Sequence, residues 1–258
     1  MKRQEGFSLL EIMVVLGVFL IITGMVFELL LVAQQRYKAE TEFLDSFQSA
    51  RIGLDQMVRD VHTAGYPPIN TVPAAVAAAN PNLVAEPFAW GVNYPAIPCS
   101  VLASCDNPGG PRRFDVIIES DVDPESNNGV EWVRYQLRGG NLFMRGVTPK
   151  VVGANPVAAM NVAGVMVPYV DNVMNNATAG EMAAIRASYP AMFPGNAAVP
   201  VFQFACGTPA GPCNALHSSR DITEITITLI VQSPNPDPRT RQMRVVTLTG
   251  LARRINPS

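Results

Sequence analysis

A single carboxylate, Glu11, lies inside a long apolar run near the N-terminus of this 258-residue chain. No charged side chain occurs between Ile12 and Phe27, and the run continues after Glu28 to Ala33. A carboxylate at membrane depth costs about 2.5–3.5 kcal/mol on insertion scales, so it is tolerable when paired and costly alone. Glu11 is therefore the first candidate functional residue. Glu28 needs no such role, because it lies about 31 Å along a helix from the start of the run, at the far interface.

A second candidate site is the acidic loop 121–131. Asp121, Asp123, Glu125 and Asn127 place oxygen ligands at alternate positions, and such ligands suit a hard cation such as Ca²⁺. The loop is not an EF-hand, because Ser126 stands where that loop needs glycine, and position 132, the twelfth and last of an EF-hand loop counted from Asp121, is not acidic. A polar connection between two strands explains the same residues, and we favour that interpretation. No other cofactor is predicted.

The four cysteines form two close pairs, Cys99 with Cys105 and Cys206 with Cys213. Neither spacing is the C-x-x-C of a zinc knuckle or a redox motif. In an exported domain we favour two local disulfides, each stabilising the fold by about 2–3 kcal/mol in the chain-entropy model. The two crossed connectivities that four cysteines allow stay open.

Catalytic residue types occur together only in the segment 216–221, which holds His217, Ser218 and Asp221. No nucleophile elbow or comparable motif frames them, and three residue types that are adjacent in sequence do not make a triad geometry. The other histidine, His62, falls in a predicted helix. We therefore interpret the segment as a solvated loop and predict that the protein is not an enzyme.

The apolar run from Phe7 to Ala33 would measure about 40 Å as a helix, which is enough to cross a bilayer. Lys2 and Arg3 before it favour a cytoplasmic N-terminus, with the rest of the chain outside. The run ends without a good small-x-small cleavage site, so a conventional secretory signal explains it poorly. A lipoprotein signal would need a cysteine at the end of the run, where there is none.

The composition allows one or two domains with an ample core. A formal net charge of −2, with 16% charged residues, does not support a nucleic-acid binder that uses its whole surface. A local basic patch is compatible with this balance, so nucleic-acid binding stays undecided.

Helical periodicity continues beyond the apolar run, and Gly65 with the two prolines that follow Tyr66 marks its end. The pattern predicts one helix over 8–64, about 85 Å long. Its second half, 34–64, has a broad apolar face, which favours packing against the chain's own head domain over a coiled-coil stalk. The glycines inside the helix are expected to be local weak points: Gly17, Gly24 and Gly53.

The rest of the chain predicts an antiparallel sheet. The predicted strands cover 114–120, 130–138, 141–145, 165–173, 222–232 and 243–251, with a turn at 139–140 and a short helix at 179–188. The segments 69–111 and 190–212 are predicted to be irregular, apart from a short strand near 88–90. The fold class is therefore α+β, with a long N-terminal helix packed on an antiparallel β-sheet head domain.

The first eleven residues resemble the type IV prepilin signature. A short basic leader, Lys2-Arg3-Gln4-Glu5-Gly6, ends in glycine, and Phe7 follows with Glu11 four positions further on. Two later segments resemble PilW-type minor pilins. One is the predicted helix end, with Arg59-Asp60 and then Ala64-Gly65-Tyr66, and the other is 133–145, with Tyr135-x-Leu137, a turn, and Leu142-x-x-Arg145.

The resemblance implies a subunit that is processed before assembly. A membrane peptidase would cut between Gly6 and Phe7 on the cytoplasmic side and methylate the new amine of Phe7. The helix would stay in the inner membrane until the subunit enters a filament, where Glu11 would pair with the N-terminal amine of a neighbouring subunit. The implied partners are prepilin peptidase, other pilin subunits, the pilus assembly platform and the inner membrane.

We therefore interpret the chain as a PilW-type minor pilin that acts in the assembly or at the tip of a type IV pilus, first in the inner membrane and then on the cell surface. Its parts would be a leader over 1–6, a helix over 7–66 that is transmembrane over 7–33, and an extracytoplasmic head over 67–258. The first alternative is a minor pseudopilin of a type II secretion system. An alternative of another class is a membrane-tethered extracytoplasmic binding or hydrolytic domain.

Overall fold

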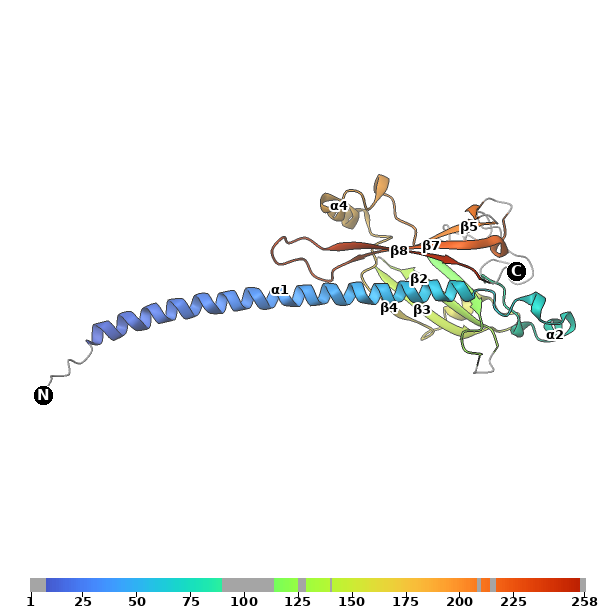
Figure 1. The fold of residues 1–258 in the computed structure, drawn as a ribbon, viewed down its shortest axis with the longest axis horizontal. Helices are drawn as coiled ribbons and strands as arrows, with labels where there is room; N and C mark the ends of the chain where they lie inside the picture. The colour runs from blue at the N-terminus through green and yellow to red at the C-terminus, as the bar shows by residue number, and fades with distance from the viewer. Residues whose placement is uncertain are drawn as a thin grey trace.

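The computed structural model describes residues 8–89, 114–124, 129–139, 141–207, 210–213 and 217–255. A β-rich head sits on the C-terminal half of one long helix, α1, whose N-terminal half projects away from it (Figure 1). The helical segments are α1 (Leu9–Thr63), η1 (Ile69–Thr71), α2 (Ala74–Ala79), η2 (Pro81–Leu83), α3 (Pro156–Met160), α4 (Ala179–Ser188), η4 (Pro194–Asn196) and η5 (Ser219–Asp221). The strands are β1 (Asp115–Ser120), β2 (Glu131–Arg138), β3 (Leu142–Pro149), β4 (Met166–Val170), β5 (Phe202–Cys206), β6 (Gly211–Pro212), β7 (Ile222–Gln232) and β8 (Val245–Arg253).

Helix α1 is continuous for 55 residues, including the positions of Gly17 and Gly24. It ends where predicted. Gly65 adopts a φ of 82°, a left-handed conformation that costs glycine little because it has no Cβ. The N–H of Gly65 donates to the Glu119 carbonyl oxygen at 2.8 Å, so the chain leaves the helix beside β1.

Two four-stranded antiparallel sheets form the head. The strands of the first follow sequence order, β1-β2-β3-β4, and those of the second are ordered β6-β5-β7-β8. Helix α1 contacts β1 and β4 of the first sheet and β7 and β8 of the second. The predicted α+β class is thus confirmed, and the antiparallel strands divide between two sheets.

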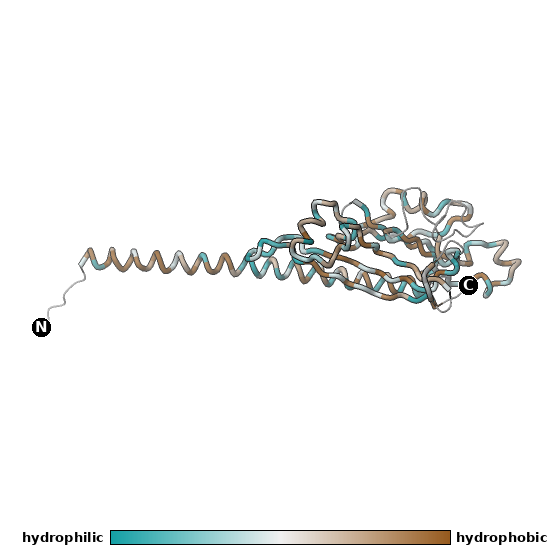
Figure 2. The backbone as a smooth tube through the Cα atoms, turned by 90° about the horizontal axis from the view of Figure 1, so that it is seen from above, coloured by the Kyte–Doolittle hydropathy of each residue, from teal (hydrophilic) through white to brown (hydrophobic). Residues whose placement is uncertain are grey.

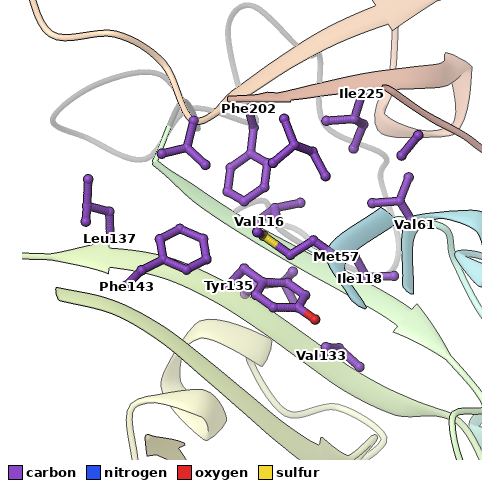
Figure 3. Packing of buried hydrophobic residues seen from close by; sticks show 14 of the residues in the cluster. Met57, Val61, Val116, Ile118, Val133, Tyr135, Leu137, Phe143, Phe202 and Ile225 are labelled. Atoms are coloured by element: carbon purple, nitrogen blue, oxygen red, sulfur yellow. The ribbon is translucent and has the colours of Figure 1, made fainter. Parts of the chain in front are cut away.

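The main core lies where α1 and the two sheets meet. Met57 and Val61 of the helix lie among Tyr135 and Phe143 of the first sheet and Phe202 of the second (Figure 3). These five side chains are at most 1% exposed. The second half of α1 is therefore packed against its own head, as its broad apolar face predicts, and a smaller apolar cluster lies beneath α4.

Two glycines bring α1 close to the sheets. A Cβ added to Gly53 would lie 2.7 Å from the Val170 Cγ2 atom on β4, and one added to Gly250 on β8 would lie 3.1 Å from the Leu54 Cδ1 atom. Gly53 was expected to be a weak point of the helix. In the structure it is a contact point instead, because only a residue without a side chain fits between the helix and β4.

The sequence-based bounds agree with the structure residue for residue at α4 and β7, and within one residue at β1 and β2. The predicted irregularity of 190–212 is wrong in part, because β5 lies there. Strand β5 has only five residues and forms by pairing with β7, a partner about twenty residues away in the sequence. Helix α2 was also missed, although its sequence Ala-Ala-Val-Ala-Ala-Ala has high helix propensity.

A buried polar network joins α1 to the first sheet. The Tyr135 hydroxyl on β2 donates to Asp60 Oδ2 at 2.6 Å, and the Arg145 guanidinium on β3 donates to the same oxygen at 3.1 Å and to the Tyr135 hydroxyl at 2.9 Å. Gln56 Nε2 donates to the other oxygen, Asp60 Oδ1, at 2.7 Å. Burial and the nearby Asp60 carboxylate both raise the pKa of Tyr135, so the phenol stays protonated as the donor. We call these four residues the Asp60 network.

We predict that Asp60→Ala lowers the free energy of unfolding by about 2–4 kcal/mol, because it leaves Arg145 and Tyr135 without their shared acceptor. The estimate is below that for a fully buried pair, since the Arg145 side chain is 24% exposed. Urea unfolding of the purified protein, followed by tryptophan fluorescence, measures the change. Asp55→Ala, at an exposed position of the same helix, is the control and should change stability by less than about 0.5 kcal/mol. Equal stability of the two variants would contradict the role given to the network.

Candidate functional site

Glu11 lies in the first turn of α1, where its N–H donates to the Ser8 carbonyl oxygen at 3.0 Å. Its side chain is exposed, as are the neighbouring Leu9 and Leu10, at 77% and 72%. Among the described residues, none forms a side-chain hydrogen bond or ion pair with Glu11. Gly6 and Phe7, the predicted processing residues, lie outside the described part of the chain.

The apolar half of α1 is exposed on every side. An 18-residue window within it has a mean hydropathy of 2.6, and none of that window is buried. Figure 2 shows the same stretch as a mostly brown helix extending beyond the head. In the described residues it is the one helix long and apolar enough to cross a membrane. So large an apolar surface needs a covering of lipid tails or other apolar helices.

The head places the other predicted residues in separate regions. Cys206 and Cys213 form a disulfide with an S–S distance of 2.03 Å, which confirms one of the two local pairs and ties β5 to the residue after β6. Cys99 and Cys105 lie outside the described residues, so their pairing stays a prediction. A disulfide is typical of a chain that folds in an oxidising compartment.

The described part of the segment with triad residue types, 217–221, contains the short helix η5 and its cap. The N–H and the hydroxyl of Ser218 both donate to Asp221 Oδ2, at 2.7 and 2.9 Å, and cap the short helix η5. These bonds hold the pKa of Asp221 below its usual range. The Ser218 hydroxyl is therefore a donor to a carboxylate in a local cap, which is a structural role.

The other histidine, His62, lies near the C-terminal end of α1, where its backbone carbonyl oxygen accepts a hydrogen bond from the Ile255 N–H.

A buried ion pair lies at the end of the head far from the projecting half of α1 (Figure 1). Lys150 Nζ approaches Glu119 Oε2 at 2.9 Å, Trp132 Nε1 donates to Glu119 Oε1 at 2.7 Å, and the Glu86 N–H donates at 2.7 Å. Burial raises the pKa of Glu119, and these donors oppose that rise. Sequence analysis missed this group, because its members come from four separate segments.

An apolar cavity of about 730 Å³ opens above this ion pair, between the η1–α2 segment and the residues after β3. Ile69, Val72, Ala77, Val84, Val151 and Val152 supply much of its wall. The charged residues at it are partnered: Arg220 Nε donates to Glu86 Oε2 at 2.7 Å, and Lys150 is held by Glu119. The cavity therefore has the chemistry to hold an uncharged apolar group.

The acidic loop is described in part. Asp121 and Asp123 follow β1, and Glu125 and Asn127 lie outside the described residues. Asp121 Oδ1 is buried without a hydrogen-bond partner, and burial together with the nearby Asp123 charge raises the pKa of Asp121. Burial also raises the pKa of Glu131, which accepts from the Val122 N–H at 2.9 Å. The described residues contain no group of three or more His, Cys, Asp or Glu side chains placed to hold a metal ion. Calcium binding by this loop stays a prediction.

Two measurements test that prediction through Asp121. If the loop binds Ca²⁺, millimolar calcium should raise the melting temperature of the detergent-solubilised protein relative to chelator, and Asp121→Asn should remove that shift. In chelator, Asp121→Asn should stabilise the protein at neutral pH, because it removes a poorly solvated charge beside Asp123. Because the pKa of Asp121 is raised in the folded state, the wild-type protein loses stability as the pH rises through that pKa. The stability that Asp121→Asn gains over the wild type should therefore vanish below about pH 4, where Asp121 is protonated in both the folded and unfolded states.

The control for this experiment is Asp171→Asn, at an exposed acidic residue outside the loop. It should leave both melting temperatures unchanged. Equal wild-type midpoints in calcium and in chelator would contradict the metal site and leave the loop as a polar turn.

Comparison with known proteins adds one finding. Residues 1–27 match the family model described as the prokaryotic N-terminal methylation motif, and no curated protein or solved structure matches the chain. The match covers the predicted processing residues Gly6 and Phe7, Glu11, and most of the exposed apolar half of α1. The N-terminal motif is that of type IV pilin-like proteins, pseudopilins included, and it implies processing by prepilin peptidase and assembly with other pilins.

Proposed function

We propose that the protein is a PilW-type minor pilin that contributes to the assembly or the tip of a type IV pilus. The observation that carries the proposal is the division of α1 into two halves. The first half follows a methylation motif and is apolar on every side, whereas the second is packed into its own head. A subunit of this form can be stored in a bilayer and can later exchange lipid for the helices of neighbouring subunits.

The Asp60 network supports the PilW-type assignment. Asp60 comes from the helix-end segment that resembles these pilins, while Tyr135 and Arg145 come from the second such segment. In the structure the two segments meet through hydrogen bonds of 2.6–3.1 Å. The residues that carry the resemblance thus form the joint between helix and head, which is a structural reason for their occurring together.

In this proposal the peptidase cuts between Gly6 and Phe7 and methylates Phe7, with the N-terminus in the cytoplasm and the head outside the inner membrane. The assembly platform then moves the subunit into the filament. There the exposed Glu11 carboxylate pairs with the N-terminal amine of a neighbouring subunit, which offsets the cost of placing it among apolar helices. The subunit would act by assembly and would need no catalytic centre.

Two other functions remain as alternatives. A minor pseudopilin of a type II secretion system would use the same kind of N-terminus, and the neighbouring genes would distinguish it. A membrane-tethered binding domain would keep its helix uncleaved, and the apolar cavity of about 730 Å³ is the observation in its favour.

Cleavage of the leader distinguishes the two pilin-like functions from the membrane-tethered domain, which would keep its N-terminus uncleaved. We predict that the mature protein begins at Phe7, because the peptidase of this family cuts after glycine. Gly6→Ala should still permit partial cleavage, whereas a bulky residue such as Gly6→Leu should block it, since the peptidase accepts only a small side chain there. N-terminal sequencing of the protein from membranes gives the answer. A mature protein that begins at any other residue would remove the main support for the proposal.

We further predict that Glu11→Ala leaves membrane insertion intact or improves it, because it deletes a charge from the apolar half of α1. It should reduce the amount of subunit in sheared pili several-fold, because the neighbouring amine loses its partner. Quantitative immunoblots of membrane and pilus fractions measure both effects. Glu28→Ala, a second carboxylate in the same apolar half, is the matched control and should give normal amounts in pili. Normal incorporation of Glu11→Ala would refute the pairing role.

A further inference from the structure

The loop that joins β7 to β8, residues 233–244, extends along α1 toward its apolar half (Figure 1). We call it the hairpin loop. Arg244 Nη1 contacts Glu40 Oε2 on α1 at 2.6 Å, and Asn235 Nδ2 donates to Glu42 Oε2 at 2.7 Å. The Arg244 guanidinium also lies over the Phe43 ring, 5.6 Å from its centroid. The hairpin loop is therefore held beside the first polar turns of the helix.

Asp237 fixes the conformation of the hairpin loop. Its carboxylate accepts hydrogen bonds from the N–H groups of Arg239 and Thr240, at 2.8 and 3.2 Å, and from Arg244 Nη2 at 2.7 Å. These donors lower the pKa of Asp237 to about 2, so it is ionised at any physiological pH. Arg244 is thus neutralised by two carboxylates, Asp237 and Glu40.

Three other arginines around this contact have no such partner. Arg36, on the exposed side of α1, and Arg239 and Arg241, at the tip of the hairpin loop, are all exposed. No ion pair within the described part of the chain involves any of them. Arg36 and Arg239 line a cleft of about 480 Å³ between the helix and the hairpin loop. We call these three arginines the basic surface.

The basic surface lies directly beyond the end of the apolar run. Arg36 comes three residues after Ala33, which is about 4.5 Å along the helix axis. The headgroup layer on each side of a bilayer is about 5–7 Å thick. The apolar run to Ala33 is about 40 Å long and the hydrocarbon core is about 30 Å thick, so a helix that tilts to keep the whole run in lipid has Ala33 at the outer edge of the core. In that orientation Arg36 and the hairpin loop beside it lie at the depth of the lipid phosphates.

We propose that Arg36, Arg239 and Arg241 bind the phosphate groups of anionic phospholipids, and that the hairpin loop is a membrane-contact surface of the head. Guanidinium groups bind phosphate oxygens through paired N–H donors, and these three are exposed and form no ion pair with a described carboxylate. The carboxylates that line the same cleft, Glu40 and Asp237, are paired with Arg244. Position favours lipid over an acidic protein as the occupant, because the surface adjoins the segment proposed to span the bilayer. The inference rests on the proposed function in this one respect.

The contact would orient the subunit while it resides in the membrane. A helix that is joined to a bilayer only through its apolar half is free to tilt and rotate. Two arginines on the hairpin loop and one on α1 hold the head to the headgroups at separate points, which fixes the face that the head presents. Removing the subunit from the bilayer would break these contacts, so they would favour the membrane-resident state over the assembled one.

The test uses the full chain in nanodiscs of phosphatidylcholine with 0 or 30 mol% phosphatidylglycerol. Hydrogen exchange of the hairpin-loop amides is followed by mass spectrometry in each lipid mixture. Because a basic residue near an anionic surface contributes about a fivefold preference, phosphatidylglycerol should slow this exchange by at least about tenfold. The protection should be lost at about 1 M salt, where the Debye length falls to about 3 Å.

The variant Arg36→Gln/Arg239→Gln/Arg241→Gln should exchange at the same rate in both lipid mixtures. A matched control, Arg51→Gln/Arg59→Gln/Arg253→Gln, removes three exposed arginines from the parts of α1 and β8 packed in the head, and should behave as wild type. Equal exchange of the wild type in the two mixtures would overturn the inference. So would protection that depends on protein concentration and not on phosphatidylglycerol, because it would indicate a protein partner. A chain that fails to enter nanodiscs at all would instead contradict the proposed function.

Discussion

Helix α1 has to suit two different environments, an apolar surrounding for its first half and the protein core of the head for its second half. The rest of the structure follows from that constraint. In a bilayer every backbone N–H and carbonyl must be bonded within the segment, which a continuous helix achieves by itself. Apart from Glu11 and Glu28, the side chains of the first half of α1 are accordingly almost all apolar, and its most apolar window is not buried against the head. From Ala50 to Val61 the same helix becomes a core element, with one face buried between two sheets. The two sheets of the head therefore pack around the second half of a helix whose first half lies outside the head.

The polar interactions of the head reflect how that helix is joined to it. Asp60 is a charged group on the buried face of α1, and it is compatible with that position because Tyr135, Arg145 and Gln56 all donate to it. An apolar interface alone would allow the helix to slide or rotate, whereas the two donors that come from the sheet, Tyr135 and Arg145, define one register. The close approaches at Gly53 and Gly250 define the same register sterically. Apolar burial supplies most of the stabilisation, and these contacts determine the geometry.

The charged groups discussed above fall into two classes: those that have partners within the folded chain, and those that are exposed without one. Buried carboxylates such as Asp60 and Glu119 have several donors each. Glu11 and the arginines of the basic surface are exposed and lie on or beside the projecting half of α1. Charges that the folded chain leaves without partners are available to groups outside it, and the partners proposed above are a neighbouring subunit for Glu11 and lipid phosphates for the arginines. Asp121 differs from both classes, since one of its oxygens is buried and has no donor.

The sequence by itself determined the elements whose signals are local. The length of α1, its end at Gly65, helix α4 and strand β7 follow from periodicity, a left-handed glycine and alternation, each of which acts over a few residues. The N-terminal motif is equally local, and a family model matches it. Tertiary structure alone decided which segments meet: the division into two sheets, the strand β5, the Asp60 network, the Glu119–Lys150 pair and the position of the hairpin loop on α1. Pairing between distant segments depends on packing and on the closure of long loops, and neither leaves a period or a spacing in the chain.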